Sequence, residues 1–203
     1  MNFSSKLLED VVESLGSLPG IGKKTALRLA LHLERDDLHI GQKIADSIVK
    51  MKSEIKRCTN CNNLSDHNLC NICTQDHRRK DILCLVESVR DVMAIEDTSQ
   101  FSGQYHVLGG RISPLEGVGP EDLSIDLLRE RVASGLIKEI VMAISPSIEG
   151  ETTIYYISKL LAEYELNISV IARGVSFGGE LEYADEITLG RSIESRVPYQ
   201  LKI

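Results

Sequence analysis

Four cysteines form the pattern in this sequence with the clearest chemistry. They are two Cys-x-x-Cys pairs, Cys58 with Cys61 and Cys70 with Cys73, separated by eight residues. Four thiolates at this spacing can bind one Zn²⁺ tetrahedrally, at Zn–S distances of about 2.3 Å. Two disulfides or four unrelated thiols are the alternatives, but nothing in the sequence indicates an oxidising compartment. We therefore predict a structural Zn²⁺ with no coordination position open to water.

A second group of residues could bind phosphate. Gly20 and Gly22 lie in a Leu-Pro-Gly-Ile-Gly turn, and Lys23, Lys24 and Arg28 follow it. Glycines in such a turn let a phosphate approach the backbone amides at the start of the next helix. Lys24 and Arg28 are one helical turn apart, so both would lie beside those amides. The pattern predicts contact with a nucleic-acid backbone; a plain helical hairpin with solvated lysines is the alternative.

Three carboxylates follow predicted strands. Glu87 ends one apolar run, and Glu149 and Glu151 follow another. We expect the last two to lie in an extended loop and to point the same way, so that with Glu87 they could hold Mg²⁺. Alternatively, the acids stabilise helix N-termini, where negative charge is favoured.

The first third of the chain must position the glycines and cations. Apolar spacing predicts helices over 5–17, from the turn to about residue 33, and over about 40–55. Helix, glycine turn and helix together predict a helix-hairpin-helix.

The second half alternates strands and helices, which predicts an α/β layer with a mainly parallel sheet. We expect its functional residues at the carboxyl ends of the strands. Residues 174–189 are predicted as a loop and a short strand that docks on the sheet or on a second subunit. The expected strands are 82–86, 105–108, 139–144 and 168–172, and the expected helices are 89–96, 124–134 and 153–164.

Composition narrows the function classes. The 203 residues carry a net charge of −7, which argues against a general nucleic-acid coat. The charge is uneven: residues 1–57 carry 10 Lys and Arg against 8 Asp and Glu, whereas residues 81–203 carry 10 against 20. No apolar run approaches the roughly 18 residues that span a bilayer, and the first residues do not resemble a signal peptide, so we expect a cytoplasmic protein without membrane contact.

Two further residues that could react are expected to be packing residues. Cys84 is expected in the core and His106 as a packed strand residue, and no nucleophile motif is found.

The order of these parts resembles the RecR family of bacterial recombination mediators. The resemblance covers essentially the whole chain and is most specific in short motifs outside the cysteines. These are Leu18-Pro-Gly-Ile-Gly22, Phe101-Ser-Gly103, Ser113-Pro-Leu115, Val118-Gly-Pro120, Glu149-Gly-Glu151, Gly174-Val175 and the Gly-Gly-Glu-Leu-Glu-Tyr tail. The α/β part is similar to a Toprim domain, the metal-binding fold shared with topoisomerases and primases.

The resemblance implies a DNA-binding protein of DNA repair and recombination that responds to DNA damage and is not an enzyme. Members form dimers that assemble into ring-shaped tetramers able to clamp DNA, single- or double-stranded. They act with RecO and RecF to load RecA at single-stranded gaps, which implies association with the nucleoid. In the family the hairpin cations face DNA, which carries over to Lys24 and Arg28 with Lys23 as a neighbour, and the Toprim face meets RecO.

The resemblance also sets the expected fold class, α+β and multidomain. It implies a helix-hairpin-helix domain over 1–57, a four-cysteine zinc finger over 58–80, a Toprim domain over 81–173 and an assembly segment over 174–203. A Toprim enzyme has Gly after its first Glu and an Asp-x-Asp pair, whereas this chain has Ser88 and Glu149-Gly-Glu151. A Mg²⁺-dependent nuclease or primase-like enzyme is therefore the second hypothesis.

Overall fold

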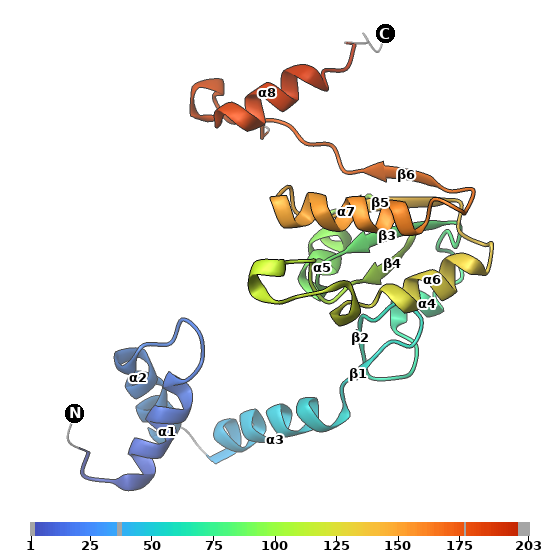
Figure 1. Cartoon of the computed structure of the whole chain (residues 1–203). Helices are drawn as coiled ribbons and strands as arrows, with labels where there is room; N and C mark the ends of the chain where they lie inside the picture. Colours follow the sequence, from blue (N-terminus) through green and yellow to red (C-terminus); the bar gives the residue numbers. More distant parts are fainter. Residues whose placement is uncertain (1–2, 36–37, 177, 199–203) are drawn as a thin grey trace. The chain divides into compact units, whose positions relative to one another are not determined.

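The computed structural model describes residues 3–35, 38–176 and 178–198, and these form two compact units (Figure 1). The first unit extends to Ile55 and the second begins at Lys56. Of the expected assembly segment, Phe177 and residues 199–203 lie outside the described residues. Among the described residues, no helix is both long and apolar enough to cross a bilayer.

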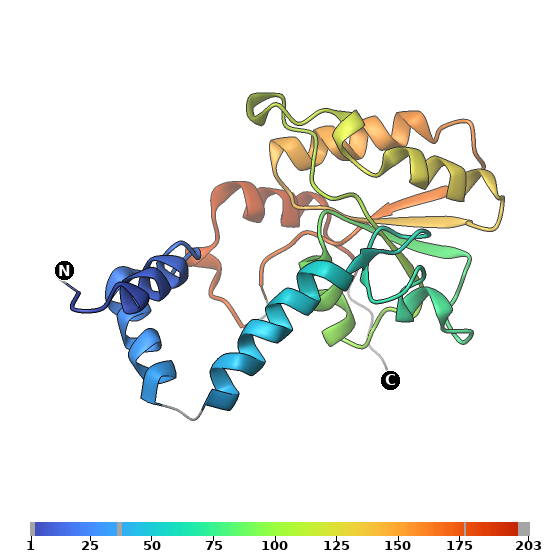
Figure 2. The ribbon, with the colours of Figure 1, turned by 90° about the horizontal axis from the view of Figure 1, so that it is seen from below.

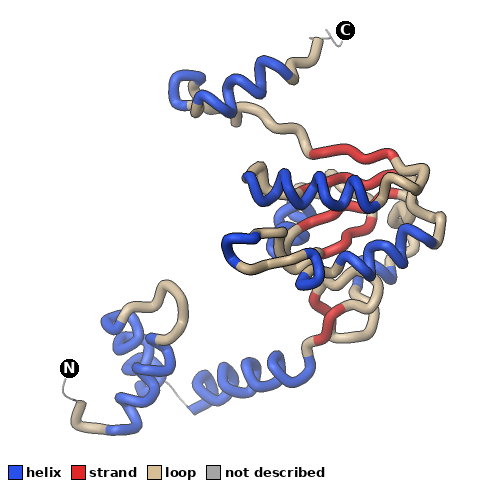
Figure 3. Tube along the Cα trace, in the orientation of Figure 1, coloured by secondary structure: helices blue, strands red, loops and turns tan. Residues whose placement is uncertain are grey.

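The first unit is helical, as predicted (Figure 3). Ser5 caps its first helix by accepting a hydrogen bond from the Leu8 amide, at 3.4 Å. Gly20 turns the chain with φ +80°, a backbone conformation that favours glycine. Val12, Ala26 and Ala30 form the small buried core between the first two helices. The helices are α1 (Lys6–Gly16), α2 (Lys23–Arg35) and α3 (Leu38–Glu54).

The second unit begins with the cysteine-rich segment, which has little regular structure. Its antiparallel strands β1 (Lys56–Arg57) and β2 (Leu64–Ser65) pair with each other, and the one-turn helix α4 (Asn71–Thr74) follows Cys70. The segment is hydrogen-bonded to the sheet that follows it, because the Val107 amide donates to the Cys61 carbonyl at 2.9 Å.

Four parallel strands then form a sheet in the order β4-β3-β5-β6, which confirms the predicted α/β layer. Alternate residues of β3 enter different cores: Leu83 and Leu85 pack with α6 and α7, whereas Cys84 and Val86 pack with α5. Figure 2 shows α6 and α7 on one side of the sheet and α5 on the other. The strands are β3 (Ile82–Val86), β4 (Gln104–Val107), β5 (Glu139–Ala143) and β6 (Asn167–Val170), and the helices are α5 (Val89–Asp97), α6 (Ile125–Ala133) and α7 (Ile148–Leu160).

Two predicted elements were wrong. Helix α7 begins at Ile148 rather than near residue 153, because the Ser147 side chain caps it by accepting a hydrogen bond from the Gly150 amide at 3.1 Å. The tail over 174–189 was expected to be a loop and a short strand, but its last residues are the start of α8 (Glu186–Glu194). Asp185 caps α8 by accepting from the Thr188 amide at 2.9 Å, so the Glu-Ile-Thr-Leu sequence is helical.

Candidate nucleic-acid interface, zinc site and Toprim acids

The turn before α2 and the first residues of α2 carry the candidate nucleic-acid contacts. Lys23, Lys24 and Arg28 are all exposed. The Ala26 amide bonds the Gly22 carbonyl at 3.0 Å, so the amides just before it have no acceptor one turn back in the helix. A Cβ added at Gly22 would have nothing within 4 Å. The protein's own packing therefore leaves open space beside Gly22, at the start of α2.

The cationic row on α2 is longer than the sequence analysis predicted. A groove of about 420 Å³ runs along α2 and is lined by Lys24, Arg28, His32 and Arg35, with Leu27 and Leu31 between them. Arg35 is exposed and was missed, although its spacing from Arg28 is two helical turns. The signal that could have found it is the continuation of the same basic face beyond Arg28.

The four cysteines lie together, as their spacing predicts. All four Sγ atoms are within 4.8 Å of one another. Cys61 and Cys70 are separated by 3.5 Å between sulfurs, and Cys58 and Cys73 by 3.9 Å. A tetrahedral Zn²⁺ with Zn–S bonds of about 2.3 Å needs sulfurs about 3.8 Å apart, so the residues fit the ion.

Hydrogen-bond donors of the segment contact two of the sulfurs. The Cys70 amide donates to Cys58 Sγ at 3.3 Å, and the Asn60 side chain donates to Cys73 Sγ at 3.4 Å. The contact between Cys61 and Cys70 lowers the pKa of Cys70 and raises that of Cys61, because the two sulfurs share one proton. None of the five cysteines is in a disulfide. The donor set is that of a closed structural zinc site.

Asn62 attaches the cysteine segment to strand β4. Its backbone has φ +60°, and its side-chain amide donates to the Val107 carbonyl at 2.8 Å. The Val107 amide in turn donates to the Cys61 carbonyl. Both backbone groups of Val107 on the outer edge of β4 are therefore hydrogen-bonded to the cysteine segment. The segment that would hold the metal therefore also covers an edge of the sheet.

The carboxylates at the carboxyl end of the sheet do not converge. Among the described residues, the only group with three or more His, Cys, Asp or Glu ligand atoms within 4.8 Å of one another is the cysteine cluster. Glu149 and Glu151 lie in the first turn of α7 rather than in an extended loop, so their side chains diverge by about 200°. The expectation that they point the same way was wrong because the helix starts earlier than predicted.

Each of the three acids has partners within the chain. Glu87 accepts a hydrogen bond from the Ser145 amide at 2.7 Å, and its other oxygen lies 3.5 Å from Arg111 Nη1. The pKa of Glu149 is lowered, first by its own backbone amide and then by the Ser147 hydroxyl. Glu151 pairs with Arg173 and Arg191. The alternative interpretation, acids that stabilise a helix N-terminus, therefore describes Glu149 and Glu151 in this structure.

Two other side chains behave as predicted for packed residues. Burial raises the pKa of the Cys84 thiol to about 12, so it stays protonated. His106 is fully buried and its Nε2 lies 2.7 Å from the Ser124 carbonyl oxygen, while burial lowers its pKa to about 4. A neutral imidazole that donates to a backbone carbonyl is a packing residue.

Family models match successive parts of the chain. The RecR helix-hairpin-helix model matches residues 8–52, and the RecR zinc finger model, which is built on four cysteines, matches 55–74. The Toprim domain model matches residues 81–172, and the RecR C-terminal model matches 174–197.

Full-length relatives agree with these matches. The recombination protein RecR of Cytophaga hutchinsonii is 52% identical over 203 residues, which is 100% of this chain and 99% of that protein. The chain belongs to the RecR family. The RecR protein of Flavobacterium johnsoniae is 54% identical over 98% of this chain and 97% of its own length. For Bacteroides thetaiotaomicron RecR the identity is 52%, over 96% of this chain and 95% of that protein.

Proposed function

We propose that this RecR-family protein is a DNA-binding recombination mediator in DNA repair. The observation that carries the proposal is the exposed cationic row on α2, which starts beside the open amides at Gly22. Lysine and arginine side chains next to free helix-start amides suit phosphate, which every DNA sequence presents. The contact is therefore with the backbone of single- and double-stranded DNA, through Gly20, Gly22, Lys23, Lys24 and Arg28.

The partners proposed for this chain come from its family. The relatives are named recombination proteins. The resemblance to the RecR family implies that this chain acts with RecO and RecF to load RecA at gaps. A homo-oligomer, a dimer or a tetrameric ring, fits the site because one α2 row offers few phosphate contacts. Several copies on one DNA raise the effective concentration of each. The protein then acts in the cytoplasm at the nucleoid, as a mediator and not as an enzyme.

The remaining proposals concern the zinc ligands, the domain limits and the three Toprim acids. Cys58, Cys61, Cys70 and Cys73 hold a structural Zn²⁺, for which the sulfur separations are suitable. The domain limits at 57/58, 80/81 and 173/174 are part of the proposal, and the succession of family matches over 8–52, 55–74, 81–172 and 174–197 supports them. Mg²⁺ at Glu87, Glu149 and Glu151 stays a prediction from the sequence, and the positions of these three side chains do not fit it.

The test is binding of labelled gapped DNA at several salt concentrations. Lys24→Ala and Arg28→Ala should each weaken binding on every sequence alike and reduce the salt dependence by about one phosphate contact. Lys6→Ala is the matched control, because Lys6 is an exposed lysine of the same unit whose ammonium already pairs with Glu9 and Asp10. It should bind like the wild type.

The same samples test the enzymatic alternative. With Mg²⁺ or Mn²⁺ and nucleotides present, the mediator should retard the DNA and leave its strands unchanged. Cleaved or extended strands that disappear with Glu87→Ala would contradict the proposal, and so would sequence-selective loss of binding in the Lys24 or Arg28 variants.

A further inference from the structure

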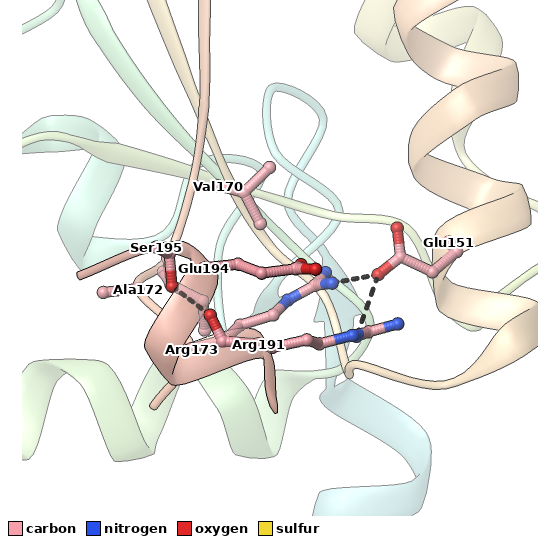
Figure 4. Close-up of a pocket in the computed structure, with 8 residues that line it drawn as sticks. Glu151, Val170, Ala172, Arg173, Arg191, Glu194 and Ser195 are labelled. Atoms are coloured by element: carbon pink, nitrogen blue, oxygen red, sulfur yellow. Dashed lines mark hydrogen bonds and ion pairs between the residues drawn. The ribbon is translucent and has the colours of Figure 1, made fainter. Parts of the chain in front are cut away.

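Two arginines from the end of the chain converge on one Toprim carboxylate. Glu151 stands in the first turn of α7, and its Oε1 forms an ion pair with Nη1 of Arg173, which follows β6. Nη1 of Arg191, from α8, lies 3.8 Å from the same oxygen. Figure 4 shows both guanidinium groups directed at Glu151. This carboxylate therefore carries two cationic partners.

The surrounding cavity holds two guanidinium groups beside two carboxylates, and no group of three metal-ligand atoms among the described residues forms there. It has a volume of about 510 Å³ and is lined by Glu151, Arg173, Arg191 and Glu194, together with residues 170–172 at the end of β6 and just after it, and Ser195. Nε and Nη2 of Arg173 are buried and have no acceptor among the described residues. Free N–H groups on a fixed positive charge repel a metal cation.

The carboxylate of Glu87, another of the three Toprim acids, also has partners within the chain. Both oxygens of Glu87 have partners, the Ser145 amide and Arg111, and only 15% of its side chain is exposed. Mg²⁺ needs oxygen ligands at about 2.0–2.1 Å in an octahedron and usually keeps several waters. To bind here, it would have to displace guanidinium groups that the chain itself places on the carboxylates.

We propose that Arg173 and Arg191 take the place, at Glu151, of the divalent cation that the Toprim fold implies. The carboxyl end of this sheet then excludes Mg²⁺ and anchors the carboxyl-terminal segment instead. In this arrangement Glu151 binds two segments: the chain after β6, through Arg173, and helix α8, through Arg191. The two arginines are 18 residues apart in the sequence. The protein uses a metal-binding position of the fold as an attachment point.

Manganese binding to the full-length, zinc-loaded protein tests the exclusion of a cation. Free Mn²⁺ is followed by electron paramagnetic resonance in the wild type, Glu151→Gln, Arg173→Met, Arg191→Met and the double arginine variant. We expect no Glu151-dependent Mn²⁺ binding in the wild type at about 1 mM, and one gained site in the double variant that Glu151→Gln abolishes. Arg129→Met, which removes an exposed arginine of α6, is the matched control and should gain no site.

Two outcomes would overturn the exclusion. One is stoichiometric Mn²⁺ binding by the wild type that Glu151→Gln removes, a result that does not depend on how the arginine variants fold. The other is a double variant with normal zinc content and circular dichroism that gains no site.

Limited proteolysis tests the anchor separately. Glu151→Gln should accelerate cleavage in the segment after β6 by about fivefold, the change expected when a half-buried ion pair is lost. Glu149→Gln is the matched control, because Glu149 lies in the same turn and its carboxylate accepts from its own backbone and Ser147. Equal cleavage in the wild type and Glu151→Gln would overturn the anchor.

Discussion

The two glycines before α2 serve different purposes, although the sequence presents them as one motif. Gly20 has φ +80°, which costs a residue with a side chain roughly 1–2 kcal/mol. Gly22 has no such backbone conformation, and a Cβ there would contact nothing within 4 Å. The fold therefore needs the first glycine, and the absence of a side chain at the second matters to a ligand that approaches the amides.

Gly22→Ala separates DNA binding from folding. We expect its free energy of unfolding to stay within about 0.5 kcal/mol of the wild type or to rise slightly, because alanine also restricts the unfolded chain. DNA affinity should fall, since the new methyl group narrows the open space beside Gly22, next to the start of α2, where a phosphate would approach. Denaturant unfolding and gapped-DNA titration on the same preparation measure the two effects.

Gly20→Ala supplies the comparison. It should lower stability by about 1 kcal/mol through the strained backbone at this turn. If Gly22→Ala instead lost as much stability as Gly20→Ala, or bound DNA as tightly as the wild type, the assigned roles of the two glycines would be wrong.

The start of α7 explains the glycine between the two acids. A Cβ at Gly150 would lie 2.0 Å from the Ser145 carbonyl oxygen, so the helix can approach the end of β5 only with glycine at this position. The Ser147 cap and this close approach place Glu149 and Glu151 in one helical turn. The sequence analysis did not identify this cap, and the close approach depends on how α7 packs on its own strand.

Gly150→Ala should destabilise the second unit by about 2 kcal/mol or more, because backbone must shift to admit the methyl group. Gly190→Ala is the matched control within helix α8. Nothing lies within 4 Å of a Cβ there, and alanine is the better helix former, so stability should be unchanged or rise by up to about 1 kcal/mol. Thermal unfolding of both variants measures the difference; similar losses in the two would contradict the packing argument.

At the scale of the whole molecule, the sequence predicted the order of parts and most of the sheet. Strands such as β3 are continuous apolar runs because both faces are buried, and the cysteine spacing fixes its own ligand set. The arginines at Glu151 could not be predicted. They are 22 and 40 residues further along the chain, so their meeting depends on where α8 returns to the sheet. Helix α8 was itself misread because β-branched Ile187 and Thr188 favour a strand in isolation.

The cysteine segment is hydrogen-bonded to the edge of the sheet through residues at its predicted zinc site. Cys61 is a predicted ligand through its sulfur, while its carbonyl accepts from the Val107 amide on the outer edge of β4. Asn62, the next residue, bonds the Val107 carbonyl. Metal binding would therefore order the backbone that covers this sheet edge. Loss of the metal should then weaken the hydrogen bonds of the segment to β4.

Zinc removal should consequently loosen the second unit and leave the first unit unchanged. After chelation, we expect hydrogen exchange at the Val107 amide to accelerate about tenfold or more, the change for losing a buried backbone hydrogen bond. Exchange in α1 and α2 is the internal control, because their core of Val12, Ala26 and Ala30 involves no cysteine. Unchanged protection of β4, or equal loss of protection in α1 and α2, would mean that the metal does not stabilise the sheet edge. Cys61→Ser should reproduce the chelation pattern without a chelator, because three thiolates bind Zn²⁺ less tightly than four and the Cys61 carbonyl loses its fixed position.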